Sequence, residues 1–284
     1  DASCYGIKKS DRNKAVEGKG RSMIRIDYDK CVGCMSCVVV CPFSVLEDGG
    51  RFPEWTDLSS KRCIECMHCG AACPELAIDF LHGPGIRREG IDPLPPNFPQ
   101  LIETFLLQRR SYRSFSPDKV PRETIEKALE IAAYAPSAKN QKPTKWVLMD
   151  DATMLGKMME IIVAYVKKEG VSPEILENLA RGRNVVMGTA TTIILGYAKG
   201  LASNPVVDTA LEINALEMIL QSFGIGTCWA GYLTRMVNAI PEIREMLKLT
   251  DEDKVYGALM VGYPRGEDYL HIPNRKRPPE FIWV

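Results

Sequence analysis

One cysteine pattern occurs twice in the first third of the chain and constrains what that part can fold into. Residues 31–42 and residues 63–74 both read C-x2-C-x2-C-x3-C-P, so the pattern repeats at an offset of 32 residues. Each run places three thiols on one tight loop, and the proline after the fourth cysteine turns the chain away from that loop. The repeat predicts two pseudo-symmetric halves of one small β-α-β-type unit.

This spacing resembles that of bacterial ferredoxins that carry two [4Fe–4S] clusters. Each cluster needs four thiolates at the corners of a tetrahedron, and the fourth cysteine of each run points toward the cluster of the other run. The first predicted cluster takes Cys31, Cys34, Cys37 and Cys73. The second predicted cluster takes Cys63, Cys66, Cys69 and Cys41.

Structural zinc and disulfide bonds are the alternative uses of closely spaced cysteines. Zinc sites usually take two cysteines from each short loop, whereas here four lie in a run that ends in Cys-Pro. A disulfide framework suits short secreted chains, but this chain has 284 residues and spends eight of its ten cysteines on the repeat. This usage favours iron–sulfur clusters in the reducing cytoplasm of an anaerobe.

Charge and hydropathy argue against two classes of partner. Lys and Arg together number 36, as do Asp and Glu, so no net charge favours nucleic acid or an anionic membrane. No apolar run is long enough to span a bilayer. The length allows one large domain or two modest ones.

A stretch crowded with Pro and Gly divides the chain. Residues 1–22 are polar and aperiodic, and we expect a leader or a cloning remnant there. The ferredoxin-like domain is predicted over residues 23–82. Residues 83–100 are predicted as a linker because their Pro and Gly content cannot sustain a helix or a central strand. The larger domain is predicted over residues 101–284.

Helices and strands alternate in the predictions for the larger domain. Strands are predicted over 145–150, 191–197 and 255–261, with helices near 101–110, 121–132, 151–168 and after Pro173. A long helix capped by Asp208 should run to about Phe223 and lie in a core or a subunit interface. Residues 226–231 are predicted as a tight turn. The apolar tail at 281–284 is expected to dock on a protein surface, either that of its own subunit or that of another subunit.

Four separated stretches of this domain could form one site for an anion and a ring. Residues 109–113 place three guanidinium groups and a hydroxyl just after a helix, which suits a phosphate and a polyol chain. Residues 136–140 offer an Asn amide that can both donate and accept hydrogen bonds. Residues 226–231 offer backbone N–H groups, and Arg275 and Arg277 add positive charge after the last strand.

These stretches resemble the ordered motifs of the nitroreductase family. The motifs are Arg-Arg-Ser-x-Arg, Ala-Pro-Ser-x-x-Asn, Phe-Gly-Ile-Gly-Thr-Cys-Trp-Ala-Gly and Val-Gly-Tyr-Pro, and the resemblance covers about residues 101–280. It implies an α+β fold, with a sheet flanked by helices, in a homodimer that binds FMN at the subunit interface. Here the small ferredoxin-like domain would precede that fold.

The resemblance also implies cofactor contacts for individual residues. Those at the FMN phosphate and ribityl chain would be Arg109, Arg110, Ser111, Arg113, Arg275 and Arg277. Those at the isoalloxazine ring would be Pro136, Ser137 and Asn140 from the other subunit, and the amides of Ala230 and Gly231 near N5. No side chain is assigned as catalytic, because in this family the chemistry belongs to FMN. The chain departs from many relatives at Asn214-Ala215, where they carry Gln-Asn, and from some at Ala230, where they carry Glu.

Together the two parts predict a flavin-dependent oxidoreductase. Electrons would pass between two [4Fe–4S] clusters and FMN and reduce a small organic acceptor such as a nitro compound, a quinone or an activated double bond. The donor would be ferredoxin or another low-potential carrier. Three alternatives stay open: NAD(P)H as donor with the clusters as exit, an electron-transfer or flavin-handling protein that serves a protein partner, and a flavin-fragmenting or dehalogenating enzyme.

Overall fold

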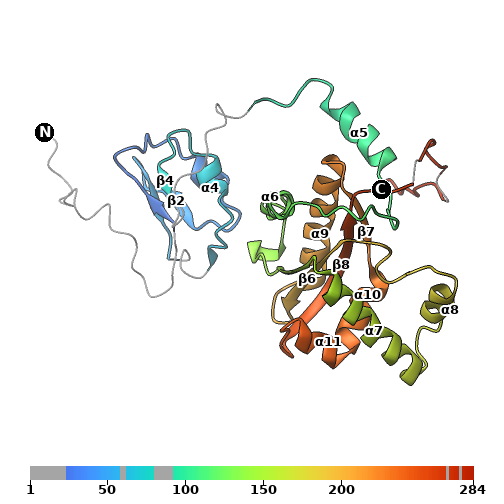
Figure 1. Ribbon diagram of the computed structural model, residues 1–284. Coiled ribbons are helices and arrows are strands. Elements are labelled where there is room, and N and C mark those ends of the chain that lie inside the picture. Colours follow the sequence, from blue (N-terminus) through green and yellow to red (C-terminus); the bar gives the residue numbers. More distant parts are fainter. Residues whose placement is uncertain (1–23, 58–61, 80–91, 267–268, 275–276) are drawn as a thin grey trace, which may run out of the picture. The chain divides into compact units, whose positions relative to one another are not determined.

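The computed structural model describes residues 24–57, 62–79, 92–266, 269–274 and 277–284. The chain divides into two compact units between Pro95 and Pro96 (Figure 1). This division lies within the predicted linker at 83–100. The predicted leader at 1–22 and the predicted phosphate contact Arg275 lie outside the described residues.

The N-terminal unit is built from short elements: β1 (Arg25–Ile26), α2 (Ser36–Val39), β2 (Leu46–Asp48), β3 (Pro53–Trp55), α4 (His68–Ala71) and β4 (Ile78–Asp79). β1 pairs antiparallel with β4, and β2 pairs antiparallel with β3. Each helix lies inside one cysteine run. A small apolar core that includes Ile26, Leu46 and Ile78 packs with Cys37 and Cys69, one cysteine from each run.

Backbone conformation in this unit repeats at the offset of the cysteine runs. The residues before the two helices, Met35 and Met67, have positive φ angles of 59° and 65°. So do Ser44 and Leu76, at 50° and 49°, which follow the last cysteine of each run. Positive φ is uncommon for residues other than glycine. Its recurrence at matched positions therefore confirms the two pseudo-symmetric halves.

The C-terminal unit contains an antiparallel four-stranded sheet with the strand order β5-β6-β8-β7. Its strands are β5 (Lys145–Met149), β6 (Thr192–Lys199), β7 (Gly226–Trp229) and β8 (Asp253–Gly262). Its helices are α5 (Phe98–Gln108), α6 (Arg122–Ala132), α7 (Ala152–Glu169), α8 (Glu174–Ala180), α9 (Pro205–Ser222), α10 (Gly231–Ala239) and α11 (Pro241–Met246), with a 3-10 turn η2 (Ala138–Asn140). The predicted strands and helices are all found within a few residues of their expected positions.

Alternating residues of strand β6 divide the core of this unit in two. Ile193 and Leu195 pack with residues of α7, α10 and α11, whereas Ile194 packs with residues of α6 and α9. Successive side chains of a strand point to opposite faces of the sheet. The sheet therefore lies between two layers of helices, as Figure 1 shows, which confirms the predicted α+β fold.

Local signals explain several helix boundaries. Asp151 caps α7, because its carboxylate accepts the Met154 N–H at 2.8 Å. The same helix ends at Gly170, whose φ of 67° suits glycine better than any other residue. α6 buries Ile125, Ala128 and Ala132, the spacing of one helix face.

Two local predictions were wrong. Asp208 does not cap α9, because the helix begins at Pro205 after Asn204, and proline fits the first helical position well. The stretch 226–231 is not a tight turn, since its first four residues form β7 and α10 starts at Gly231. The strand that pairs with β7 is distant in sequence, so the Gly-rich local composition was misleading.

Several apolar side chains of the C-terminal unit stay at the surface. α5 buries none of its residues, and Leu211 of α9 and Phe223 just after that helix are 40% and 42% exposed. In the tail, Phe281 and Trp283 are 76% and 95% exposed. Among the described helices, none has the length and apolar character needed to cross a membrane.

Candidate functional site

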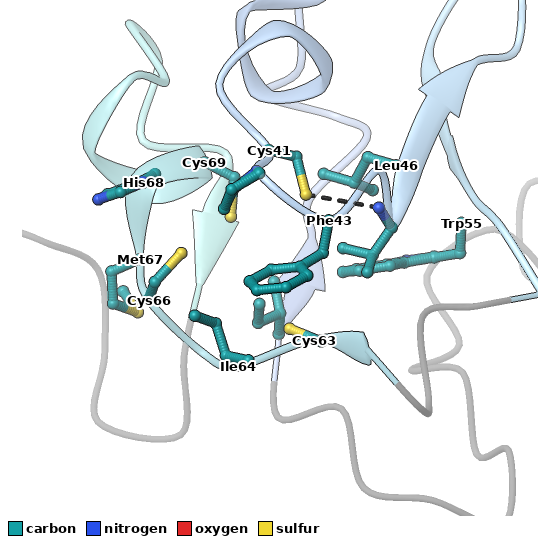
Figure 2. A pocket seen from close by; sticks show the side chains of 13 residues that line it. Cys41, Phe43, Leu46, Trp55, Cys63, Ile64, Cys66, Met67, His68 and Cys69 are labelled. Carbon is teal, nitrogen blue, oxygen red and sulfur yellow. Dashed lines mark hydrogen bonds between the residues drawn. The ribbon is translucent and has the colours of Figure 1, made fainter. Parts of the chain in front are cut away.

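The cysteines of the repeat line two cavities of the N-terminal unit. The first, here called the Cys73 cavity, is lined by Cys31, Cys34, Cys37 and Cys73. The second, the Cys41 cavity, is lined by Cys41, Cys63, Cys66 and Cys69 (Figure 2). Each cavity takes three cysteines from one run and the fourth from the other. The structure thus brings together the same two sets of four that the spacing predicts.

Backbone N–H groups point at the sulfurs that cross between the runs. The Val45 N–H donates to Cys41 Sγ at 3.4 Å, and the Ala77 N–H donates to Cys73 Sγ at 3.2 Å. Such bonds stabilise negative charge on sulfur, and they tune the reduction potential of a cluster. In the Cys41 cavity the wall is otherwise largely apolar and aromatic, with Phe43 beside the sulfurs in Figure 2.

Burial raises the pKa of thiols in both cavities. It raises the pKa of Cys69 to about 11, and it also raises the pKa values of Cys37 and Cys63. The thiolate is the form that binds metal, so loading these cavities would release protons. Among the residues that the structure describes, no three His, Cys, Asp or Glu side chains are grouped so that they could hold a metal ion. Four thiols gather around each cavity, which is the donor set of a thiolate-bound cluster.

In the C-terminal unit, residues 109–115 run along the edge of β7. The Tyr112 N–H donates to Thr227 O at 2.9 Å, and Ser111 forms a bridge with the same residue. Phe115 forms a second bridge, to Pro264. Strand-like pairing at Ser111 and again at Phe115 therefore holds the Arg-Arg-Ser-x-Arg segment in an extended conformation.

A polar network centred on Glu217 lies behind this segment. Glu217 Oε1 accepts from Arg109 Nη1 and from Thr227 Oγ1, both at 3.2 Å. Gln221 Nε2 donates to Arg110 O at 2.9 Å and to Thr227 Oγ1 at 2.7 Å. The network joins the motif to α9 and β7. It also engages the Arg109 guanidinium in an ion pair with Glu217, and the phosphate contact expected for Arg109 stays a prediction.

The other arginines of the predicted phosphate site lie in different surroundings. Arg110 stacks on Tyr269, with the guanidinium carbon 5.7 Å from the ring centroid, and donates to His271 O at 3.3 Å. Arg113 lines the large cavity described next. Arg277 is exposed in the tail. Of the described arginines in this set, Arg113 lines the large cavity, whereas Arg110 and Arg277 do not.

A cavity of about 1130 Å³ opens beside Arg113. Its walls include Arg113, Asn178, Arg183, Trp229, Gly231 and Arg235. Gly188 lets the loop after α8 approach the motif, since its φ is 57° and a Cβ there would lie 2.3 Å from Arg113 O. Trp229 belongs to this wall and also packs over Gly257, where a Cβ would lie 2.6 Å from its ring. Tyr112, in contrast, packs edge-on against Tyr269.

The turn at residues 136–140 is held by the first turn of α9. Asp208 Oδ1 accepts the Ala138 N–H at 2.7 Å, and Ser137 Oγ accepts the Lys142 N–H at 3.0 Å. Within the described residues this turn does not line the large cavity of its own chain. That placement is compatible with the expected contact of Pro136, Ser137 and Asn140 with a flavin on the other subunit.

The two backbone amides expected at the flavin ring, those of Ala230 and Gly231, lie in different surroundings. The Ala230 N–H donates to Ala258 O at 2.8 Å, and Ala230 is only 1% exposed. This amide is thus already bonded within the sheet, and a contact of Ala230 with a flavin stays a prediction. Gly231 begins α10 and lines the cavity. The first N–H groups of a helix have no partner inside the helix and favour an anion or an electron-rich atom.

Sequence reasoning missed Arg183 and Arg235 in the cavity wall and Glu217 in the network. A signal existed for Arg235, which lies four residues after Gly231 and so on the same face of α10. For Glu217, the signal was a carboxylate followed by Gln221 one helical turn later on a buried face. Arg183 carried no local signal, since an arginine beside a glycine is common at helix ends.

The fold and the sites define a small cysteine-rich unit followed by an α+β unit with a basic cavity. A model of the nitroreductase family matches residues 106–263, more than half of the chain. A model of the 4Fe-4S dicluster domain matches residues 23–76. The chain belongs to the nitroreductase family of oxidoreductases, and its N-terminal unit is a ferredoxin-like domain.

Individual relatives match about three-fifths of the chain. A protein assigned as an NADH dehydrogenase or NAD(P)H nitroreductase in Archaeoglobus fulgidus is 27% identical over 175 residues, which are 60% of this chain and 90% of the relative. Mouse iodotyrosine deiodinase 1 is 28% identical over 189 residues, and the match spans 61% of this chain and 64% of the relative. The crystal structure of a Bacteroides fragilis nitroreductase with bound FMN shares the fold, with a TM-score of 0.56 and 22% identity over 64% of this chain and 98% of that one.

Proposed function

We propose that this chain is an FMN-dependent oxidoreductase whose ferredoxin-like domain carries two [4Fe–4S] clusters. Electrons from ferredoxin or another low-potential donor would enter through the N-terminal unit and reduce a small organic acceptor at the C-terminal unit. When bound, the clusters would carry one electron each, and FMN would accept electrons singly and deliver them in pairs. The acceptor would be a nitro compound, a quinone or an activated double bond.

The observation that carries this proposal is the composition of the two cysteine cavities. Each collects four thiols, one of them from the other run, and each crossing sulfur accepts a backbone N–H. Four thiolates around one space match the ligand set of a [4Fe–4S] cluster. The residues proposed as ligands are therefore all eight cysteines of the repeat, four in each cavity.

The cavity of the C-terminal unit supports FMN as the second cofactor. At about 1130 Å³ it exceeds the range of roughly 300–1,000 Å³ that is typical of ligand pockets, so it leaves room for an acceptor beside a flavin. Arg113 would hold an anionic part of FMN, and the N–H of Gly231 would meet the ring. Arg110, Ser111 and Arg277 remain proposed phosphate contacts because of the family resemblance, and the FMN-bound structure of the same fold supports FMN as the ligand.

The exposed apolar surface supports a homodimer. α5 buries none of its residues, and the tail from Phe281 to Trp283 exposes three large apolar side chains. Large apolar groups of this kind are usually covered in the functional assembly. A partner subunit would cover them and would bring the 136–140 turn to the neighbouring cavity.

The direction of electron flow can be tested by anaerobic rapid mixing. We expect reduced ferredoxin to bleach the broad cluster absorbance first and the flavin band second. NADH and NADPH should act much more slowly, because the clusters would be the entry point. Rapid flavin bleaching by a nicotinamide before any change in the clusters would contradict this direction. The clusters would then be the exit of a nicotinamide-fed flavoenzyme.

The FMN site can be tested with Arg113→Gln. The variant is expected to bind FMN about 10-fold to 100-fold more weakly, because a hydrogen bond to a charged group contributes roughly 1.5–3 kcal/mol. Binding would be measured by titrating flavin-free protein with FMN and following flavin fluorescence. Arg122→Gln is the matched control, since Arg122 pairs with Asp150 at 2.7 Å on the surface and does not line the cavity. Equal FMN affinity in both variants would reject this assignment of Arg113.

A further inference from the structure

One wall of the large cavity is formed by α10 and by the end of α8 with the loop that follows it. Gly231, Tyr232 and Arg235 of α10 line the cavity together, as expected for residues three and four apart on one helix face. Asn178 and Arg183 line it from α8 and the loop. The motifs that mark the expected flavin site include Gly231 but none of the other four, Asn178, Arg183, Tyr232 and Arg235.

The charged side chains in the described lining of this cavity are all positive. Among the described residues that line the cavity there are three arginines, Arg113, Arg183 and Arg235, and no Asp or Glu. Arg183 and Arg235 form no ion pair with any carboxylate in the described part of the chain. Arg113 is already assigned to FMN in the proposed function. Neither Arg183 nor Arg235 therefore has a salt-bridge partner in the described part of the chain.

The Arg235 guanidinium is held in a defined orientation. Its central carbon lies 4.8 Å from the centroid of the Tyr232 ring, so the planar group is stacked on an aromatic face. The Glu174 carboxylate beside the Tyr232 hydroxyl raises the pKa of Tyr232. A guanidinium stacked on a ring can still present edge N–H groups to a planar anion.

The geometry points to an anion subsite in this wall, in which Arg235 and Arg183 bind a carboxylate on the acceptor. The acceptor class is thereby narrowed to small aromatic or unsaturated molecules that carry an anionic group. This inference rests on the proposed function, because the acceptor would share the cavity with FMN. Arg235 acts here as a specificity-determining residue and takes no part in electron transfer.

The test compares two ligands of nearly equal shape, 4-nitrobenzoate and its uncharged analogue 4-nitrobenzamide. Their dissociation constants would be measured by calorimetry on oxidised protein loaded with clusters and FMN, so that no turnover is needed. We expect the wild-type protein to bind the carboxylate about 10-fold more tightly than the amide. Arg235→Gln should reduce this preference about fivefold to tenfold and leave the amide affinity unchanged.

Two further variants make the result specific. Arg235→Lys keeps the charge but loses the planar edge, and should retain part of the preference. Arg181→Gln removes a neighbouring exposed arginine at the end of α8 that does not line the cavity, and should retain all of it. The inference is overturned if the wild type binds both ligands equally, or if Arg235→Gln weakens both ligands to the same extent.

The same titrations on flavin-free protein separate this inference from the proposed function. If the protein cannot be loaded with FMN, the proposed function fails, and a carboxylate preference that depends on Arg235 would still establish the anion subsite. If FMN binds and abolishes carboxylate binding by competition, the preference belongs to the flavin phosphate site. That outcome would overturn the subsite and leave the proposed function intact.

Discussion

The double variant Cys37→Ala, Cys73→Ala is expected to keep one cluster, whereas Cys69→Ala, Cys73→Ala is expected to lose both. Cys37 and Cys73 line the same cavity although they belong to different runs, so the first pair of substitutions leaves the Cys41 cavity complete. Cys69 and Cys73 belong to one run but line different cavities. The measurement is iron and acid-labile sulfide per chain. About four irons are expected for the first variant and close to none for the second, against about eight for the wild type.

The opposite assignment gives the reverse result, which makes the comparison decisive. If each run held its own cluster, Cys69→Ala, Cys73→Ala would keep about four irons and Cys37→Ala, Cys73→Ala would lose all of them. Cys228→Ala serves as the control, because Cys228 is buried in β7 and lines neither cysteine cavity. This variant should retain the full iron content.

Glu217→Ala should lower the stability of the C-terminal unit by about 3 kcal/mol, or by roughly 10 °C in Tm. The substitution leaves Arg109, Gln221 and Thr227 without the carboxylate that joins them, and Thr227 is fully buried. Donors and charges that lose their partner in a buried site cost more than the pair contributed. Thermal unfolding followed by far-ultraviolet circular dichroism would measure the change. FMN affinity should fall with it, since the network holds the motif against β7.

Matched variants separate the network from the loss of a charge alone. Glu130→Ala removes an exposed carboxylate from α6 and should change the free energy of unfolding by less than about 0.5 kcal/mol. The double variant Arg109→Ala, Glu217→Ala removes both members of the ion pair and should be less destabilised than the sum of the two single variants. If Glu217→Ala unfolds at the same temperature as Glu130→Ala, the network has no energetic role.

The spacing of the cysteines was enough to predict their grouping in space. The first three cysteines of each run are so close in sequence that their thiols can only gather on one loop. The proline after the fourth cysteine turns the chain, so that the fourth thiol points away from the other three. The helices and central strands were also predictable, because their periodic apolar residues and caps, such as Asp151 at α7, are local signals.

The contacts of the candidate flavin site were less predictable, because they join distant segments. Arg109 and Glu217 are 108 residues apart, and no residue near Arg109 in the sequence indicates that Glu217 is its partner. The Ala230 amide is likewise bonded to a residue of β8, which could not be read from the Gly-rich stretch around it. Motif similarity names the residues near a site, but the hydrogen bonds that each one makes decide which of them can meet a ligand.

The crossing of the last cysteine between runs also sets the moment at which the protein can be metallated during its synthesis. When the ribosome has delivered the first run, it has supplied three thiols of one set and a single thiol of the other. The Cys41 set is completed by Cys69 and the Cys73 set only four residues later. Both sets become complete almost together, although their first members, Cys31 and Cys41, were made well before. If both sets take clusters, a nascent chain would pass from no complete ligand set to two within one short step of elongation, and the machinery that inserts iron and sulfide would meet both sets at once.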